Sequence, residues 1–229
     1  ADVRDHDRRR DEPLRRVVHG VLQVLGVASR GADDVVAHVM YVVEVDRGFE
    51  VVVRGPRKEI HTAQVAEQRG ALFGAALRAP DHGHLQPYRF LTVEGAAREQ
   101  MGELLAEAAQ MQEGEVTEAM IDKARNGPLR APLVVVVIAK LQEHVKYPKA
   151  EQLLAAGCAA HGILLAAYAQ GIGAVWRTGD LAYSAHVAKG LGLAADEQII
   201  AYLYLGTPER ELRRAPEVRV EAFVSAWEG

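Results

Sequence analysis

The side chains best suited to binding chemistry lie in one short stretch, 78–89, which reads RAPDHGHLQPYR. This stretch lies between an alanine-rich run, Gln68–Leu77, that predicts a helix, and Tyr88–Glu94, which predicts a strand. It combines guanidinium, carboxylate, imidazole and amide groups, carried by Arg78, Asp81, His82, His84, Gln86 and Arg89. A loop held between two regular elements is where binding groups usually gather, so we expect a planar polar ligand here. The composition alone fits a solvated turn without a ligand equally well.

A second polar group, Trp176-Arg177-Thr178, ends a short apolar run that predicts a strand. Arginine beside a hydroxyl residue offers ligands for a phosphate, and tryptophan offers an aromatic surface. The alternative is that Trp176 packs in the core. The preceding Gly171-Ile-Gly173 is not a dinucleotide-binding fingerprint, because Trp176 stands where the third glycine belongs and a helix precedes it instead of a strand.

Composition excludes several other kinds of site. The single cysteine, Cys158, rules out an intramolecular disulfide framework and any cysteine-rich zinc site, which fits a reducing cytoplasm. We expect this thiol to pack inside an apolar helix. His82 and His84 could ligate a metal ion, but they lack the spacing of zinc sites, so we expect none. No serine lies in a Gly-x-Ser-x-Gly elbow, which argues against hydrolysis.

The charge balance bounds the partners of the chain. Across 229 residues the net charge is -4, so we expect no general attraction to nucleic acid or to an anionic membrane. The first residues mix arginine and aspartate, and no apolar segment follows them directly, so we expect no signal peptide.

Hydrophobic periodicity predicts an α+β fold, because helices and strands alternate without a regular βαβ rhythm. The predicted strands are Tyr88–Glu94, Leu133–Ala139, Ala174–Arg177 and Ile199–Leu205. The predicted helices are Gln68–Leu77, Ala96–Gln112, Thr117–Asn126, Glu151–Gln170 and a short one that Ser184 caps. Among the strands, Leu133–Ala139 is a continuous β-branched run, typical of burial on both faces.

The run Leu153–Ala169 contains no Asp, Glu, Lys or Arg. A helix that is apolar all round is buried in a soluble protein. One domain of this size rarely buries both sides of a helix, so we expect a homodimer interface here, with Leu164 in it. A central core helix in a monomer is the alternative.

Taken together, these blocks resemble the FMN-dependent nitroreductases, and in particular the small bacterial YdjA-like NAD(P)H nitroreductases. The first block is Arg78–His82 with Gln86–Phe90. The others follow in the family's order: Ile121–Arg125, Arg130–Leu133, Ala156–Cys158, Gly173–Gly179 and Tyr202–Pro208. The resemblance covers roughly residues 65–229.

This resemblance implies a homodimeric flavoprotein with a central mixed or antiparallel sheet flanked by helices. FMN would bind noncovalently between subunits. NADH or NADPH would deliver hydride to flavin N5, and a nitroaromatic, quinone or related small molecule would then accept the electrons in ping-pong order. No residue of the chain is implied as a catalytic acid, since solvent can supply the protons.

The same resemblance assigns cofactor contacts residue by residue. It places on FMN the side chains of Arg78, His82, Gln86, Trp176, Arg177 and Thr178. It places on the nicotinamide dinucleotide the segment Ala166, Ala167, Tyr168, Ala169, Gln170 and Gly171. The remaining assignment concerns the flavin phosphate. The family begins with an Arg-Arg-Ser clamp, and a gap-free count puts Val53-Arg54-Gly55 at that place.

The resemblance fails before about residue 60, so we divide the chain into a divergent N-terminal extension, 1–55, and an FMN-binding domain, 56–229. Only Arg54 survives from the phosphate clamp, although Gly55 can still offer its backbone N–H. This alteration motivates an alternative function, a flavin- or ligand-binding protein without efficient turnover. A third possibility is a purely structural dimerising domain.

Overall fold

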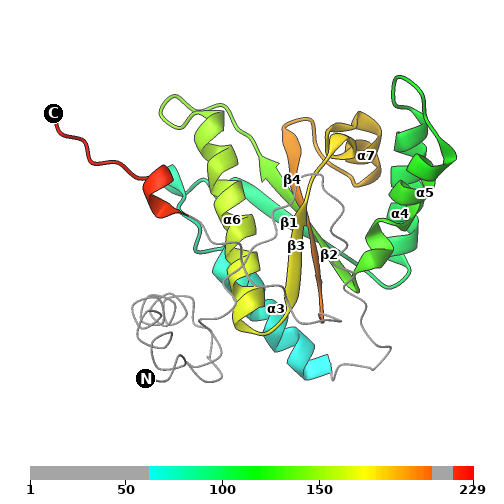
Figure 1. Cartoon of the computed structure of the whole chain (residues 1–229), viewed down its shortest axis with the longest axis horizontal. Coiled ribbons are helices and arrows are strands. Elements are labelled where there is room, and N and C mark those ends of the chain that lie inside the picture. The colour runs from blue at the N-terminus through cyan, green and yellow to red at the C-terminus, as the bar shows by residue number, and fades with distance from the viewer. Residues whose placement is uncertain (1–61, 208–218) are drawn as a thin grey trace.

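The computed structural model describes residues 62–207 and 219–229, with side chains from residue 68 onward in the first range (Figure 1). The extension 1–55, with Arg54 and Gly55, lies outside the described residues. The strands are β1 (Tyr88–Glu94), β2 (Leu133–Lys140), β3 (Gly173–Arg177) and β4 (Glu197–Gly206). The α-helices are α3 (Thr62–Ala76), α4 (Ala97–Gln110), α5 (Glu118–Asn126), α6 (Lys149–Ala169) and α7 (Ala185–Gly190). Short 3-10 turns are η1 (His82–His84), η2 (Pro128–Arg130), η3 (Asp180–Tyr183) and η4 (Val220–Ala222).

The strands form one four-stranded antiparallel sheet in the order β1-β2-β4-β3, so β1 and β3 are its edges. The predicted strands are confirmed, and the fold is α+β. Strand β2 lies in the centre, and its residues from Val134 to Ala139 are 0% exposed. The β-branched run therefore marks a strand buried on both faces, as predicted.

Helices cover both faces of the sheet (Figure 1). Helices α3 and α6 pack on one face, where Val135 and Val137 join their core. Helices α4 and α7 pack on the other face, where Val134 and Val136 point. Successive side chains of a strand point to opposite faces, so each strand of this sheet contributes to two separate cores.

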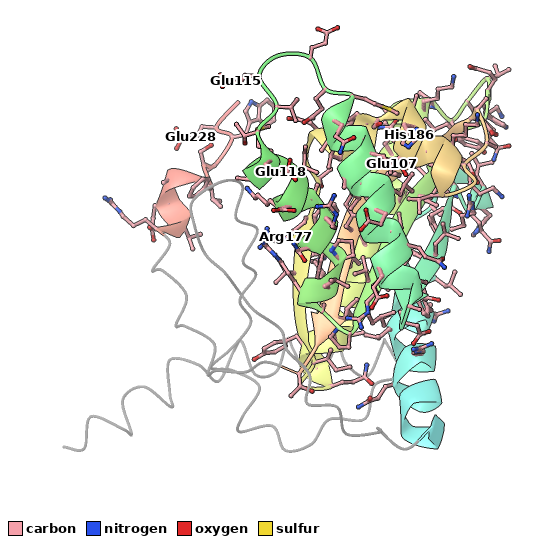
Figure 2. All side chains as sticks on the ribbon, turned by 90° about the vertical axis from the view of Figure 1, so that its right-hand side faces the viewer. Glu107, Glu115, Glu118, Arg177, His186 and Glu228 are labelled. Carbon is pink, nitrogen blue, oxygen red and sulfur yellow. The ribbon has the colours of Figure 1, made fainter. Side chains whose placement is uncertain are left out.

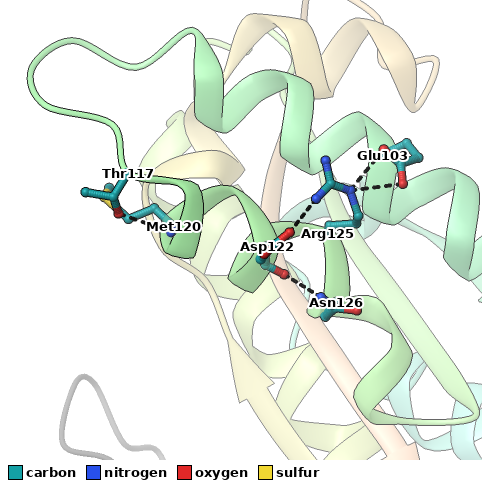
Figure 3. A network of polar contacts seen from close by, with 6 residues as sticks. All are labelled: Glu103, Thr117, Met120, Asp122, Arg125 and Asn126. Atoms are coloured by element: carbon teal, nitrogen blue, oxygen red, sulfur yellow. Dashed lines mark hydrogen bonds and ion pairs between the residues drawn. The ribbon is translucent and has the colours of Figure 1, made fainter.

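The hairpin of α4 and α5 is closed by close backbone packing and surface ion pairs (Figure 3). A Cβ on Gly102 would lie 2.2 Å from the Arg125 carbonyl oxygen, so only glycine allows this approach. The Arg125 guanidinium donates to Glu103 at 3.1 Å and to Asp122 at 2.6 Å. Thr117 accepts a bond from the Met120 N–H at 3.4 Å, which confirms it as the N-cap of α5.

Helix α6 buries one side against the sheet and leaves the other exposed. Cys158 is exposed within the protomer, so it does not pack in the protomer's own core. Leu164 is 3% exposed and lies in the protomer's own core, which corrects its placement in an interface. The exposed side of α6 carries Leu154, which is 69% exposed, and Cys158. The run from Leu153 to Ala169 contains no Asp, Glu, Lys or Arg to mark its exposed side, so its composition did not show which side faces the sheet.

By length and composition, α6 is also the one described helix that could cross a membrane. The most apolar 18-residue stretch of this helix is 56% buried within the protomer, and mostly buried core helices meet the same criteria of length and composition.

Candidate functional site

The loop between α3 and β1 has an irregular backbone. Gly83, His84 and Gln86 have φ angles of 81°, 54° and 47°, in the left-handed region that only glycine adopts readily. The Asp81 carboxylate accepts backbone bonds from Leu85 at 3.2 Å and from Gln86 at 2.7 Å. Asp81 therefore holds the loop in shape, and the strained positions of His84 and Gln86 are of the kind found at binding sites.

The two arginines of this loop have different roles. Arg78 is exposed, and within residues 68–207 and 219–229 no carboxylate forms an ion pair with it. Arg89 instead donates through Nε and Nη2 to both oxygens of Glu197, each at 2.6 Å. Arg78 is thus the guanidinium that remains available to an anionic or polar ligand, whereas Arg89 ties the start of β1 to the start of β4 across β2.

The Arg89–Glu197 pair is the clearest electrostatic feature beside the loop. Hydrogen bonding from Arg89 lowers the pKa of Glu197 to about 2, against the opposing effect of burial. The Ala194 N–H adds a bond to the same carboxylate at 3.0 Å. Because the Glu197 side chain is only 7% exposed, this pair is better shielded from water than a typical surface ion pair.

His82 is held between α6 and a neighbouring loop. Its Nδ1 lies 2.6 Å from Glu151 Oε2, and its ring packs edge-on against Tyr147 with a centroid distance of 4.4 Å. Tyr147 in turn stacks on His144 at 4.2 Å. Within the described part of the chain, no group of three His, Cys, Asp or Glu side chains is placed to hold a metal ion.

The predicted Trp176-Arg177-Thr178 group is divided between the two faces of the sheet. Trp176 packs against the α6 side and donates from Nε1 to Thr178 Oγ1 at 3.0 Å. Arg177 lies on the α4 and α5 side, with its guanidinium carbon 6.0 Å from the centre of the Tyr204 ring (Figure 2). Neighbouring residues of a strand alternate between faces, so Arg177 points away from Trp176 and Thr178, and the predicted contact of all three with FMN stays a prediction.

Arg177 and Arg130 lie close enough to Tyr204 to affect its ionisation. Burial raises the pKa of the Tyr204 hydroxyl, and the two guanidinium groups act against that rise. The Tyr204 hydroxyl lies beside the turn that leads into Arg130, since a Cβ on Gly127 would come within 3.7 Å of it. Arg177 therefore belongs to a basic cluster beside η2.

The first loop and the Trp176–Thr178 group lie at opposite edges of the sheet. The loop leads into β1, and the second group ends β3. Three strand spacings separate the two edges, or roughly 14 Å. One protomer therefore does not bring the two groups together, whereas a second copy could place its β3 edge beside the first copy's loop.

The segment predicted to contact nicotinamide closes the far end of α6. Ala166 and Ala167 are 0% exposed, so they offer no surface to a ligand in this protomer, and their predicted contact is not supported by their burial. The Ala166 carbonyl accepts from the Gln170 backbone and side chain, which caps the helix. Tyr168, Ala169 and Gln170 are partly exposed and Gly171 is exposed, so a contact through them stays a prediction.

Sequence reasoning missed Glu151 and Tyr147, the partners of His82. The only local signal was an acidic residue at the start of the predicted helix Glu151–Gln170, which is common for reasons of helix stability alone. Their contact with His82 depends on the packing of α6 beside η1, which no short-range pattern reports.

The fold is α+β, with an antiparallel sheet between two helical layers. A loop with an exposed arginine lies at one edge of the sheet, and the hydrogen-bonded pair Trp176–Thr178 lies at the other. These groups suit a ligand that is both anionic and aromatic. The family model described as "Nitroreductase family" matches residues 65–207. The chain belongs to the nitroreductase family.

Individual relatives agree with this assignment. The chain is 43% identical over 147 residues to the Escherichia coli K12 protein named "Putative NAD(P)H nitroreductase YdjA", covering 64% of this chain and 79% of that protein. A nitroreductase-like protein from Bacillus cereus has a similar structure, with a TM-score of 0.62 and 21% identity over 79% of this chain and 92% of that one. A Bacteroides fragilis nitroreductase solved with bound FMN gives a TM-score of 0.56 and 16% identity, covering 78% and 94%.

Proposed function

We propose that this protein is an FMN-dependent oxidoreductase that uses NADH or NADPH to reduce a nitroaromatic, quinone or related acceptor by a ping-pong mechanism. Membership of the nitroreductase family supports the reaction class, and the family's bacterial relatives are in keeping with a cytoplasmic setting. The observation that carries the proposal is the exposed Arg78 guanidinium, which no described carboxylate neutralises, in the same irregular loop as His82 and Gln86.

The donors of the described residues fit FMN. Its phosphate and the polar edge of its ring need cationic and amide donors, which Arg78, His82 and Gln86 offer. Trp176 offers an aromatic surface, and Thr178 a hydroxyl group. When bound, FMN would supply the capacity to take up two electrons as hydride and release them to an acceptor. The chain's own residues would bind and orient the flavin and set the charge around it.

We further propose that the working form is a homodimer. Two observations support it: the exposed apolar side of α6, and the distance between the two groups of flavin ligands within one protomer. In a two-fold dimer the same surface meets itself, so the exposed side of α6 around Leu154 can form both halves of the interface.

Spectroscopy of the purified protein tests the activity. We expect flavin absorbance bands that bleach anaerobically on addition of NADH or NADPH and return on addition of a nitroaromatic or a quinone. A flavin that binds but is not bleached would favour a binding protein without turnover. A protein that stays colourless after addition of FMN would contradict any flavin-dependent function.

A further inference from the structure

The first turn of α6 contacts the proposed flavin loop through a single carboxylate. Glu151 Oε2 lies 2.6 Å from His82 Nδ1. The nearby cation of the same turn, Lys149, is paired with Glu143, so it does not compete for Glu151. The Asp81 carboxylate is occupied by backbone N–H groups of its own loop. Among the described residues, Glu151 is therefore the carboxylate that pairs with His82.

Gln152, the next residue of α6, fixes the loop 141–148, whose Tyr147 packs against His82. Gln152 is 2% exposed, and its Nε2 donates to the carbonyls of Gln142 and Tyr147, both at 2.9 Å. Its Oε1 accepts from the Gln142 N–H at 3.0 Å. These bonds fix the backbone of Tyr147, whose ring packs against the His82 imidazole.

Gly83 makes this packing possible. A Cβ at Gly83 would lie 2.2 Å from the Tyr147 ring, so the loop can approach Tyr147 only without a side chain there. The imidazole of His82 is thus contacted by Glu151 at Nδ1 and by the Tyr147 ring, and the first turn of α6 positions both.

We propose that Glu151 is a positioning residue for His82 in the FMN site, an assignment that rests on the proposed function. A carboxylate at Nδ1 requires a proton on that nitrogen, whether the imidazole is neutral or charged. Nε2 is then the ring nitrogen left for the flavin, and the orientation of the ring is fixed before the flavin arrives. A carboxylate that orients a ligand-binding histidine in this way is a recurring arrangement in proteins.

The tautomer of His82 tests this role without any flavin. Long-range proton–nitrogen correlation spectra of the full-length protein, with His82 assigned through His82→Gln, report which ring nitrogen carries the proton when the ring is neutral. We expect Nδ1 in the parent protein and a shift of the proton toward Nε2 in Glu151→Ala. Glu151→Gln should keep the parent tautomer, because its amide oxygen can still accept from Nδ1. An unchanged tautomer in Glu151→Ala would overturn the proposal.

Titration with FMN tests the consequence for binding. Glu151→Ala should raise the Kd for FMN about two- to fivefold, as for a partly exposed ion pair, and Glu151→Gln should raise it less. In a His82→Ala background the Glu151→Ala change should have no further effect. Glu107→Ala removes the carboxylate of another His–Glu pair, in which His186 Nε2 lies 2.9 Å from Glu107 Oε2 away from the flavin loop, and it serves as the matched control.

The outcomes separate this inference from the proposed function. If the parent protein binds FMN and Glu151→Ala binds it equally well, Glu151 has no positioning role, and the proposed function stands. If the parent protein binds no FMN, the proposed function fails and this role fails with it, whatever the tautomer of His82.

Discussion

Arg78 and Arg89 show what the sequence can and cannot indicate about a single residue. Both lie in one polar loop, and either could bind an anion. Arg89 forms an ion pair with Glu197, which is 108 positions away along the chain. No local pattern reports a partner at that distance, so only the folded chain shows that Arg78 is the available guanidinium.

Arg78→Ala should therefore weaken FMN binding. Loss of a hydrogen bond to a charged group costs about 1.5–3 kcal/mol. The Kd for FMN should then rise roughly ten- to a hundredfold, measured by titration of the apoprotein. Arg125→Ala is the matched control, because that arginine is paired on the α4–α5 surface (Figure 3) and should leave the Kd unchanged. Equal Kd values for Arg78→Ala and the parent protein would remove Arg78 from the site.

The Arg89–Glu197 pair predicts a pH-dependent stability. The pKa of Glu197 in the folded protein is lowered to about 2 from an ordinary value of 4.5, chiefly by the Arg89 hydrogen bonds. A lowered folded-state pKa stabilises the fold above the unfolded value, and this contribution is lost as pH falls through the folded one. Glu197→Gln should thus reduce the free energy of unfolding by about 2 kcal/mol at pH 7.

Denaturant unfolding at several pH values measures this effect. The difference between Glu197→Gln and the parent protein should shrink between about pH 5 and pH 2, as the parent carboxylate becomes protonated. A difference that stays constant over this range would show that the Glu197 charge does not stabilise the fold.

At the scale of elements, hydrophobic periodicity predicted every strand of the described sheet. It did so because β-branched runs such as Leu133–Ala139 and caps such as Thr117 are local signals. It did not show which side of α6 faces the sheet, since no Asp, Glu, Lys or Arg marks a surface between Leu153 and Ala169. It also did not separate Trp176 from Arg177, although strand alternation alone would have done so.

The exposed side of α6 leads to a prediction about the proposed homodimer. Leu154→Asp should weaken the dimer while leaving the protomer folded, because this side chain is 69% exposed within the protomer. Leu164→Asp should instead unfold the protomer, since it puts a charge into the core. Light scattering gives the mass and circular dichroism gives the fold of each variant. A Leu154→Asp protein that remains fully dimeric at low concentration would place the interface elsewhere.

At the scale of the whole molecule, the two groups of predicted flavin ligands belong to opposite edges of one sheet. The family resemblance implied a site between subunits, but the residues alone gave no reason for it. The order β1-β2-β4-β3 supports the proposed shared site, because a second copy could place its β3 edge beside the loop that leads into β1. The phosphate clamp at Arg54 and Gly55 lies outside the described residues, and its role stays a prediction.

Mixed dimers test most directly whether two copies share the flavin site. Arg78→Ala and Thr178→Asp each damage one group of ligands, the second by placing a negative charge where we expect the phosphate or ring of FMN. Each variant alone should bind little FMN when the flavin is limiting. If the site is shared, random mixing of equal amounts leaves about one quarter of the sites without either lesion, and these should bind FMN with the affinity of the parent protein. If the mixture binds no more FMN than the two variants measured separately, both groups act within one protomer or neither binds the flavin, and the shared site is contradicted.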